Sequence, residues 1–320
     1  MQNNILFKSL YAKIIESHYV LLVTHKNPDA DTLSSALSLS NFFYENKIKH
    51  KIFNSNPKEQ LPRKLDFLNK FEKIVNEPPE YYDLVIYLDC ATLSRVGYDL
   101  NTSVQSVLID HHKSNSLFAD INIVDEKKGS TSELLYNFYI QNNLQISKNN
   151  AECLYVGIYD DTIGLTTPRT NKNTFDILSK LMELKIDVSY ISDQLLRRDS
   201  LARFKLIPKI MNTLDLYDEG KLAMIHLENQ WLKDTGANIL ECDDVVNNVL
   251  AIGIVKIVIY LRIIDNKVRV SLRSKNDIDV SLLASFFNGG GHQNSAGLTI
   301  NTNKIEIAKE KLLKVIINHK

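Results

Sequence analysis

Four short apolar runs in the first half of the chain each lead into acidic or histidine residues. The runs lie at 21–24, 84–88, 107–109 and 156–159. They are continuous rather than alternating, which is typical of parallel strands buried on both faces. Open α/β sheets bind ligands just beyond the carboxyl ends of their strands. The polar residues that end these runs are therefore predicted to meet at one edge of a sheet.

Segments with helical periodicity separate these runs. An amphipathic helix is predicted from Leu33 to about Tyr44, a further strand at 48–53, and a helix start with capping residues at 130–133. Strands that alternate with helices are typical of a parallel sheet covered by helices. The pattern predicts that residues 1–185 form an α/β domain with a mainly parallel sheet of about five strands and helices on both faces.

The second part of the chain has a different pattern. Residues 186–217 have helical spacing, mixed charge and no strand signals, and they are predicted to form a helical linker. Residues 218–320 are predicted to form a smaller α/β domain with a mixed sheet. Its predicted elements are strands at 222–227, 256–263 and 268–272, a turn at 265–266, helices at 243–250, 280–287 and 305–317, and a glycine-rich turn at 288–292.

Length and composition fit a soluble protein with two domains. At 320 residues, the chain exceeds the size at which one hydrophobic core usually stops growing. Its 44% hydrophobic and 24% charged residues are ordinary values. The 38 lysines and arginines balance the 38 aspartates and glutamates, whereas long duplex nucleic acid rewards a basic face. Long duplex nucleic acid is therefore not expected as a partner, while a small anionic ligand is compatible with this charge.

Cysteine usage and the N-terminal sequence indicate a cytoplasmic protein. Cys90, Cys153 and Cys242 are widely spaced and match neither a disulfide scaffold nor a zinc site of paired cysteines. The first residues lack the basic and apolar regions of a signal peptide. The apolar stretches are shorter than the roughly 18–20 residues needed to cross a bilayer. We therefore expect no membrane partner.

The polar residues at the predicted sheet edge have the composition of a metal site. They are His25, Asp29, Asp31, Asp89, Asp110, His111, His112, Asp160 and Asp161. Mixed aspartate and histidine ligation argues against structural zinc and favours manganese or a similar first-row ion, with magnesium also compatible. Two such ions clamp a phosphoryl group and activate a water molecule. The predicted chemistry is therefore hydrolysis.

Each of these segments also has a simpler interpretation. Asp29 or Asp31 could cap the helix that follows them, Asp89 could occupy a surface turn, and the adjacent histidines 111–112 could be surface residues. The neighbouring carboxylates 160–161 would repel each other if they were buried without a cation. Four such segments in one α/β frame favour the metal site.

The second predicted domain offers possible contacts for an anion. The three glycines at 289–291 would let backbone N–H groups approach a phosphate closely, with His292 beside them. Arg273 and Ser274 follow a predicted strand and add a cation and a hydroxyl. The simpler interpretations are a flexible turn with a solvent-exposed histidine and ordinary residues at the end of a strand.

Taken in order along the chain, these motifs resemble the DHH phosphoesterase superfamily. The matching motifs are His25-x-x-x-Asp29-x-Asp31, Asp89, Asp110-His111-His112, Asp161-Thr162, Arg273-Ser274 and Gly289-Gly290-Gly291-His292. The last two resemble the DHH-associated domain of the nanoRNase and pAp-phosphatase (oligoribonuclease) branch. The chain departs from the family pattern at Ala30, 33–35 and 163–165, which weakens any transfer of substrate preference.

The resemblance implies a role for each matching residue. One divalent ion would be held by His25, Asp29 and Asp89, and a second by Asp31, Asp89, His111 and Asp161. Asp89 would bridge the two ions, which would be Mn²⁺, with Mg²⁺ or Co²⁺ as alternatives. His112 would contact the scissile phosphate or the leaving group, with support from Asp110. The substrate would be bound by Arg95, Arg273, Ser274, Gly289, Gly290, Gly291 and His292, although an ordinary exposed arginine is the simpler interpretation of Arg95.

The activity implied by the resemblance is hydrolysis of short oligoribonucleotides or linear dinucleotides such as pGpG and pApA. Removal of the 3′-phosphate from pAp, a mononucleotide bisphosphate, would be a related activity at the same site. A pyrophosphatase or polyphosphatase is the alternative enzyme, although Arg273 and the glycine–histidine turn argue against it. A non-catalytic nucleotide sensor is the other alternative, and the full set of ligand residues argues against it. The sequence does not indicate the oligomeric state, the cleavage polarity or the base preference.

Overall fold

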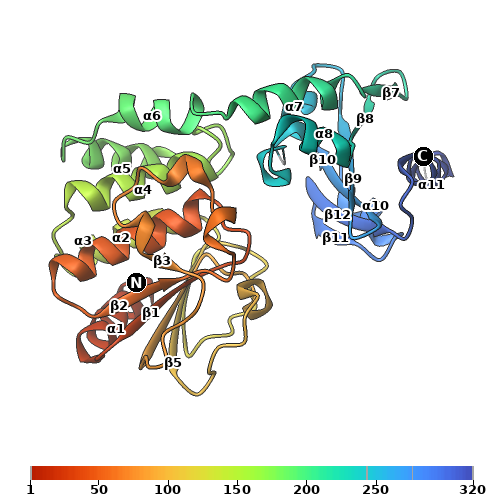
Figure 1. The fold of residues 1–320 in the computed structure, drawn as a ribbon. Helices are drawn as coiled ribbons and strands as arrows, with labels where there is room; N and C mark the ends of the chain where they lie inside the picture. Colours follow the sequence, from red (N-terminus) through yellow and green to blue (C-terminus); the bar gives the residue numbers. More distant parts are fainter. Residues whose placement is uncertain (1, 243, 276, 319–320) are drawn as a thin grey trace. The chain divides into compact units, whose positions relative to one another are not determined.

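The chain divides into two compact units, which meet in sequence between Arg198 and Asp199. The structure is a computed structural model that describes residues 2–242, 244–275 and 277–318. The boundary falls within the segment 186–217 that the sequence predicts to be a linker. Each unit has its own six-stranded sheet and hydrophobic core over the described residues (Figure 1).

The sheet of the first unit is parallel throughout. Its strands, β1 (Val20–Thr24), β2 (His50–Phe53), β3 (Ile74–Val75), β4 (Leu84–Leu88), β5 (Gln105–Asp110) and β6 (Ile121–Val124), lie in the order β3-β2-β1-β4-β5-β6. Thr24 pairs with Leu88, and Leu88 pairs with Ile109. The carboxyl ends of β1, β4 and β5 are therefore level. The strand order reverses direction between β1 and β4, which is where open α/β sheets bind their ligands.

The helices of the first unit are α1 (Gln2–Glu16), α2 (Ala30–Glu45), α3 (Thr131–Gln141), α4 (Lys148–Asp161), α5 (Lys172–Met182) and α6 (Val188–Leu196). Residues of α1 to α6 share one core with alternate strand residues such as Leu22 and Ile86. The other sheet face packs against η4 (Leu93–Val96) and nearby loop residues such as Phe118. The sequence predicts helices on both faces of this sheet. Over residues 2–198, α1 to α6 instead pack on one face. Short 3-10 turns η1 (Lys58–Gln60), η2 (Arg63–Leu65) and η3 (Phe71–Lys73) precede β3.

One predicted strand is wrong. The run 156–159 belongs to α4, which begins with a capping box formed by Ser147 and Asn150. This part of α4 is largely buried and has no charged side chain before Asp160, so it lacks the polar face of an amphipathic helix. A short, continuous apolar run does not distinguish a buried helix from a buried strand. The predicted helix start at 130–133 is confirmed, because the Ser130 hydroxyl accepts a hydrogen bond from the backbone N–H of Glu133.

The second unit contains a mixed sheet, as predicted. Its strands, β7 (Asp215–Tyr217), β8 (Leu222–Leu227), β9 (Ile257–Ile264), β10 (Lys267–Ser274), β11 (Gly290–His292) and β12 (Ser295–Ile300), lie in the order β11-β12-β10-β9-β8-β7. The β8 and β9 strands are parallel, and the other neighbours are antiparallel. Two predictions were wrong here. The segment 186–217 contains β7, and part of the predicted glycine-rich turn forms β11.

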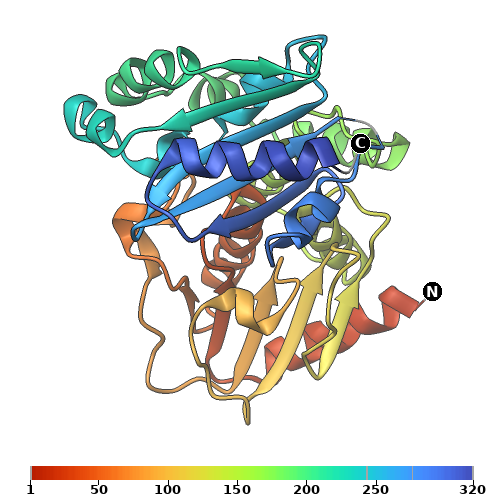
Figure 2. The same ribbon diagram turned by 90° about the vertical axis from the view of Figure 1, so that its right-hand side faces the viewer.

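The helices of the second unit pack on both faces of its sheet. They are α7 (Leu201–Met211), α8 (Asn229–Thr235), α9 (Val245–Leu250), α10 (Val280–Ser285) and α11 (Ile305–Asn318), with a 3-10 turn η5 (Ile239–Cys242). Buried residues of α10 and α11 share one core with the sheet, and those of α7 and α9 share the other. Figure 2 shows α11 lying across its sheet face. No described helix is both long and apolar enough to span a membrane.

Candidate metal centre

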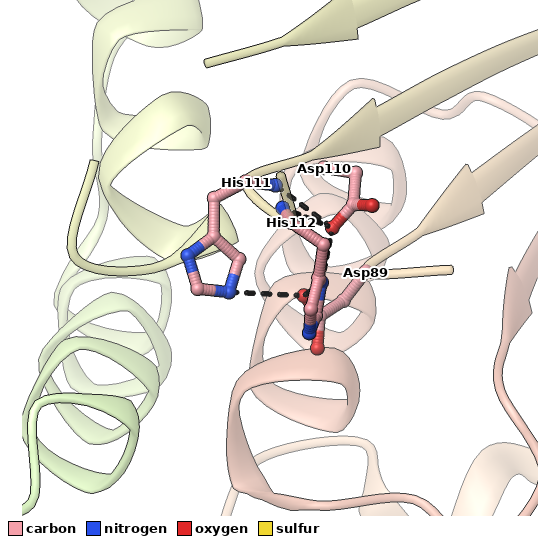
Figure 3. A group of neighbouring side chains, drawn as sticks. All are labelled: Asp89, Asp110, His111 and His112. Atoms are coloured by element: carbon pink, nitrogen blue, oxygen red, sulfur yellow. Dashed lines mark hydrogen bonds and ion pairs between the residues drawn. The ribbon is translucent and has the colours of Figure 1, made fainter. Parts of the chain in front are cut away.

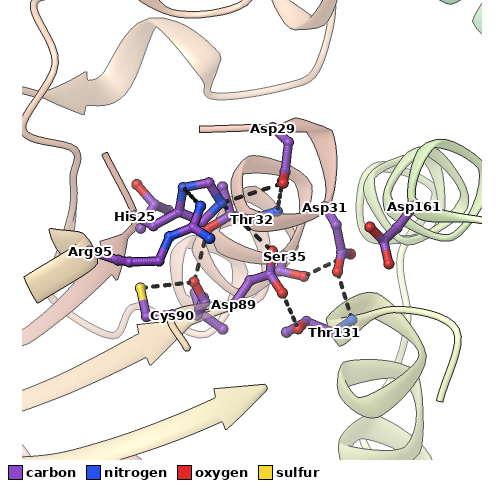
Figure 4. Close-up of polar contacts among 12 residues, drawn as sticks. His25, Asp29, Asp31, Thr32, Ser35, Asp89, Cys90, Arg95, Thr131 and Asp161 are labelled. Carbon is purple, nitrogen blue, oxygen red and sulfur yellow. Dashed lines mark hydrogen bonds and ion pairs between the residues drawn. The ribbon is translucent and has the colours of Figure 1, made fainter. Parts of the chain in front are cut away.

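The polar residues predicted from the first half of the sequence converge at the carboxyl edge of the first sheet. His25 directly follows β1, Asp89 directly follows β4, and Asp110 is the last residue of β5. Asp31 lies in the first turn of α2, and Asp161 is the last residue of α4. Two helices and three strands thus present carboxylates and imidazoles to one place (Figures 3 and 4).

The ligand atoms form three overlapping groups, in each of which the atoms lie within 4.8 Å of one another. The groups are His25, Asp29 and Asp89; Asp31, His111 and Asp161; and Asp89, Asp110, His111 and His112. Asp89 belongs to two of the groups, and its Oδ1 lies 3.5 Å from Nε2 of His111. This arrangement allows one carboxylate to contact two cations.

Asp29 supports both interpretations of its sequence motif. Its side chain caps α2 by accepting a hydrogen bond from the backbone N–H of Thr32 at 3.0 Å. Its second oxygen lies 3.4 Å from Nε2 of His25. Because the carboxylate is half-exposed, it can cap the helix with one oxygen and offer the other to a ligand.

The buried Asp31 carboxylate is held by the start of α3. It accepts hydrogen bonds from the backbone N–H of Thr131 at 2.6 Å and of Ser132 at 3.1 Å, and from the Ser132 hydroxyl at 2.6 Å. Negative charge is favoured at a helix N-terminus. At Gly157 of α4, an added Cβ would lie 2.6 Å from Oδ1 of Asp31. Glycine at this position therefore lets α4 approach the carboxylate.

The Asp89 side chain is oriented by its own backbone conformation and by one hydrogen bond from a hydroxyl. The Thr131 side chain donates a hydrogen bond to Oδ1 of Asp89 at 2.9 Å. The residue has a φ of 59°, in the left-handed region that aspartate and asparagine tolerate better than most residues. This conformation turns the chain sharply at the end of β4 and directs the carboxylate into the cluster.

Two histidines direct Nε2 into the cluster and Nδ1 away from it. Nδ1 of His25 lies 2.9 Å from the backbone oxygen of Lys26, and Nδ1 of His111 lies 3.3 Å from that of Lys128. A carbonyl partner for Nδ1 is the usual arrangement for a histidine that binds a metal through Nε2. Both imidazoles are almost completely buried.

The electrostatics of the cluster fit bound cations. Nε2 of His111 and Oδ2 of Asp161 are buried, lie 3.3 Å apart and have no hydrogen-bond partner among the described residues. Burial, together with neighbouring carboxylates, raises the pKa of Asp161 to about 8 and that of Asp89 well above its usual range. Burial also lowers the pKa of His111 to about 4, which leaves a neutral ring able to act as a ligand. Such crowded carboxylates are expected to bind a divalent cation.

Asp110 and His112 form a hydrogen-bonded pair at the rim of the cluster. Asp110 is buried, whereas the His112 side chain is about a quarter exposed. Asp110 Oδ1 accepts hydrogen bonds from the backbone N–H groups of His111 and His112, and Oδ2 accepts one from the Asn115 amide. These contacts, shown in part in Figure 3, keep the carboxylate turned toward His112.

One acidic and one basic residue from the sequence analysis, Asp160 and Arg95, lie beside the cluster. Asp160 pairs with Lys64 at 2.8 Å and belongs to none of the three ligand groups. Arg95 places its guanidinium 3.4 Å from Nδ1 of His25, and Figure 4 shows it beside that ring. Arg95 is therefore close enough to the cluster to contact an anion bound there.

The structure gives several second-unit candidates a structural role. The Ser274 hydroxyl donates to the backbone oxygen of Ile278 at 2.6 Å and accepts a hydrogen bond from the Asn294 amide at 3.1 Å. An added Cβ at Gly289 would lie 2.4 Å from the backbone oxygen of Gly297.

The remaining candidates of the glycine-rich turn, Gly290, Gly291 and His292, have different surroundings. At Gly291, an added Cβ would lie 2.4 Å from the backbone oxygen of Ser295, and φ is 151°. The Cβ position of Gly290 is open, with no atom of the described residues within 4 Å. His292 pairs with Ser295 in the β11–β12 ladder, and Arg273 lies on β10 opposite the same Ser295. The pairing with Ser295 brings Arg273 and His292 to the same end of the second sheet.

Sequence reasoning missed several residues that position the cluster. Thr131 and Ser132 were recognised only as the start of a helix, although their N–H groups and hydroxyls bind Asp31 and Asp89. The available signal was that acidic ligands are stabilised at helix N-termini. Arg169, whose guanidinium lies 2.9 Å from Nδ1 of His111, carried no motif and was not identified.

Comparisons with known proteins match both units of the chain. Residues 19–158 match the DHH family, N-terminal domain, and residues 223–318 match the DHHA1 domain. A probable bifunctional oligoribonuclease and PAP phosphatase from Streptococcus mutans is 28% identical over 295 residues, covering 91% of this chain and 92% of that protein. A bifunctional oligoribonuclease and PAP phosphatase from Bacillus subtilis is 27% identical, covering 88% and 89%.

A solved structure has the same fold as this chain over nearly the whole length of both. An exopolyphosphatase-related protein from Bacteroides fragilis superimposes with a TM-score of 0.89 and 25% identity. The match covers 97% of this chain and 96% of that chain. The similarity therefore extends over both units, in agreement with the two sequence matches.

Proposed function

We propose that this chain, which carries a DHH family N-terminal domain followed by a DHHA1 domain, is a metal-dependent phosphoesterase. Its substrates are short oligoribonucleotides and linear dinucleotides such as pGpG and pApA, and it also removes the 3′-phosphate of pAp. The observation that carries the proposal is the buried cluster of aspartates and histidines at the sheet edge. Similarity to the Streptococcus and Bacillus proteins over about nine-tenths of their lengths supports the substrate class.

Two divalent cations would be held by the residues of the cluster. His25, Asp29 and Asp89 would bind one, and Asp31, Asp89, His111 and Asp161 would bind the other. When bound, such cations neutralise charge on a phosphoryl group and lower the pKa of a coordinated water molecule. We propose Mn²⁺ as the native ion, with Mg²⁺ or Co²⁺ as alternatives, because mixed imidazole and carboxylate ligands suit first-row ions.

His112 would act on the leaving group. With Nδ1 held by Asp110, its Nε2 is the nitrogen available to a substrate. Attack of water at phosphorus breaks the P–O ester bond, and the departing oxygen needs a proton. A doubly protonated His112, with its Nδ1–H bonded to Asp110, would supply that proton from Nε2 and keep the Nδ1 proton. Asp110 acts through the orientation of His112 and does not itself contact substrate.

Each unit offers groups that would bind substrate phosphate. Arg95 would contribute from the first unit, and Arg273, Ser274, His292 and glycines 289–291 from the second. A few local contacts of this kind suit a small anionic ligand such as a short oligoribonucleotide or a mononucleotide bisphosphate. The Ser274 hydroxyl already bonds Ile278 and Asn294, so it would have to exchange a partner to bind phosphate.

A substrate panel tests the proposal. Protein supplied with Mn²⁺ would be incubated with labelled RNAs of graded length, pGpG, pApA, pAp, pyrophosphate and polyphosphate. Preferred turnover of the short RNAs, dinucleotides or pAp supports the proposal. Preferred turnover of pyrophosphate or polyphosphate would favour the alternative enzyme. Binding of nucleotides without any turnover would favour a sensor.

A further inference from the structure

Two arginines of the first unit make the same kind of contact with the candidate metal centre. Arg95 places its guanidinium 3.4 Å from Nδ1 of His25, and Arg169 places its guanidinium 2.9 Å from Nδ1 of His111. In Figure 4, Arg95 and Asp161 lie at opposite sides of the cluster. Arg169 follows Asp161 in the chain and contacts the histidine that lies 3.3 Å from it. The two guanidiniums therefore approach the cluster through different histidines.

Two groups compete for Nδ1 of His111, the Arg169 guanidinium and the backbone oxygen of Lys128. Nδ1 of His111 also lies 3.3 Å from the backbone oxygen of Lys128. A neutral imidazole nitrogen either accepts a hydrogen bond or donates one. Nδ1 can therefore accept from Arg169 or donate to Lys128, but it cannot do both. When Nε2 of His111 ligates a cation, the proton of the neutral ring is on Nδ1 and bonds the Lys128 oxygen. The guanidinium of Arg169 then has no acceptor on this ring.

The segment between Asp161 and Arg169 contains a turn with an unusual backbone. Ile163, Gly164 and Leu165 follow one another with φ values of 49°, 65° and 68°. A left-handed conformation is a clear outlier for a β-branched residue, and such conformations concentrate at functional sites. The turn is closed by a hydrogen bond from the N–H of Thr166 to the backbone oxygen of Thr162 at 2.9 Å. This geometry returns the chain toward the cluster after Asp161.

The positive charge of Arg169 opposes the rise that burial causes in the pKa of Asp161, but it forms no direct ion pair among the described residues. Lys64 is paired with Asp160, the neighbour of Asp161 in the chain, at 2.8 Å. Within residues 2–198, by contrast, no salt bridge joins Arg169 to a carboxylate, and the residue is exposed. An arginine remains charged at any working pH and presents a planar set of donors that matches phosphate oxygens.

We propose that Arg169 is a substrate-binding residue, whose guanidinium binds the phosphate oxygens of the substrate once His111 ligates a cation through Nε2. It would complement Arg95 on the other side of the cluster. This inference rests on the proposed function in one respect, that the ligand carries a phosphate group. It adds a second phosphate-binding arginine within the first unit, independent of the residues on β10 and β11.

The test compares three variants with the wild-type protein. Arg169→Ala removes the guanidinium, and Arg169→Lys keeps the charge without the planar donors. Arg197→Ala is the matched control, because Arg197, the residue directly after α6, is an exposed arginine that pairs with Asp193 at 2.7 Å. Calorimetry measures Mn²⁺ binding to the substrate-free protein, then AMP binding to the Mn²⁺-loaded protein. Steady-state kinetics with pAp or pGpG separate KM from kcat.

Arg169→Ala is expected to weaken AMP binding and raise KM by about 10- to 100-fold, the loss expected for a charge-assisted hydrogen bond. Arg169→Lys should recover part of the loss, and Arg197→Ala should match wild type. The Mn²⁺ affinity should be kept, since Arg169 supplies no ligand. Unchanged AMP affinity and KM would overturn the proposal, and so would loss of Mn²⁺ binding, which would make Arg169 a ligand-positioning residue. AMP binding that depends on Arg169 in a protein without turnover would reject the proposed function and retain this inference.

Discussion

Nδ1 of His112 lies 2.7 Å from Oδ1 of Asp110, a carboxylate that is completely buried. Burial raises the pKa of Asp110, but the hydrogen bonds from His112 and Asn115 outweigh it and lower that pKa overall. The ionised carboxylate therefore accepts the Nδ1 proton and leaves Nε2 directed away from it. This pairing selects one tautomer and one orientation of the histidine.

Replacing Asp110 by asparagine should slow the reaction without weakening binding. The amide keeps the shape of the carboxylate but removes the charge that favours a protonated Nδ1. We expect kcat to fall by about 100-fold or more, within the range attributed to proton transfer by a positioned side chain, while KM and Mn²⁺ content stay close to wild type. Single-turnover kinetics with metal analysis would measure this. An Asp110→Asn variant with normal kcat would show that His112 does not depend on this pair.

Replacing Asp89 by asparagine should abolish turnover while the fold is kept. Asparagine tolerates the left-handed φ of 59° at this position as aspartate does, and it can still accept the Thr131 hydrogen bond. It cannot supply negative charge between two cations. Activity and bound Mn²⁺ would be measured together, with the melting temperature as the control for folding. Near-wild-type activity with full metal content would contradict the two-metal arrangement.

The sequence predicted the fold and the cluster residues for a physical reason. His25, Asp89 and Asp110 follow apolar runs that are strands, and parallel strands place their carboxyl ends at one edge. Asp161 was identified correctly as a neighbour of these residues, but from a mistaken strand, since the run before it lies in α4.

Contacts that depend on packing could not be predicted in the same way. Thr131 and Ser132 bind the carboxylates because α3 begins at the same sheet edge. Arg169 approaches His111 after a left-handed turn at 163–165. The β7 strand is short and mostly exposed, so it lacks the apolar run by which strands are recognised.

The stability of the protein should respond to Mn²⁺ more strongly at high pH than at low pH. Burial raises the pKa of Asp31 to about 6 and that of Asp161 to about 8. Because these pKa values exceed those of the unfolded chain, the metal-free folded state binds more protons between about pH 4 and about pH 8. Metal-free protein should therefore lose stability as the pH rises through this range.

Cations replace those protons, so the rise in melting temperature on adding Mn²⁺ should grow over the same range. Thermal unfolding with EDTA and with excess Mn²⁺, at about pH 5 and about pH 8, would measure both effects. A shift of equal size at the two pH values would contradict the assignment of these carboxylates as ligands. Calcium at the same concentration controls for a general effect of divalent ions.

Arg273→Ala and His292→Ala should each weaken substrate use without affecting the metals. Both residues belong to the second unit, whereas the ligand groups found among the described residues lie in the first. Loss of one charged hydrogen bond would weaken transition-state binding by about 1.5–3 kcal/mol, and kcat/KM would fall accordingly. Mn²⁺ stoichiometry should remain that of the wild type. Loss of metal from either variant would show that the second unit has been assigned the wrong role.

The enzyme should prefer very short substrates. The chain has no net charge, and its proposed phosphate contacts are few: Arg95 and Arg169 in the first unit, and Arg273 and His292 in the second. Proteins that follow a long single strand combine a basic groove with stacked aromatic side chains. A small set of local contacts can bind a terminal phosphate and one or two nucleotides but adds little affinity for the rest of a longer strand.

Catalytic efficiency is therefore expected to be greatest at about two to four nucleotides and to depend weakly on salt, because few phosphates are neutralised. The measurement is kcat/KM for RNAs of graded length at low and high salt, with pAp as the minimal substrate. A steep fall of kcat/KM with salt for long RNA, together with processive degradation, would contradict this expectation. It would mean that the fold assembles a basic track from lysines that are scattered in the sequence, since a strand can be followed only where successive phosphates meet positive charge.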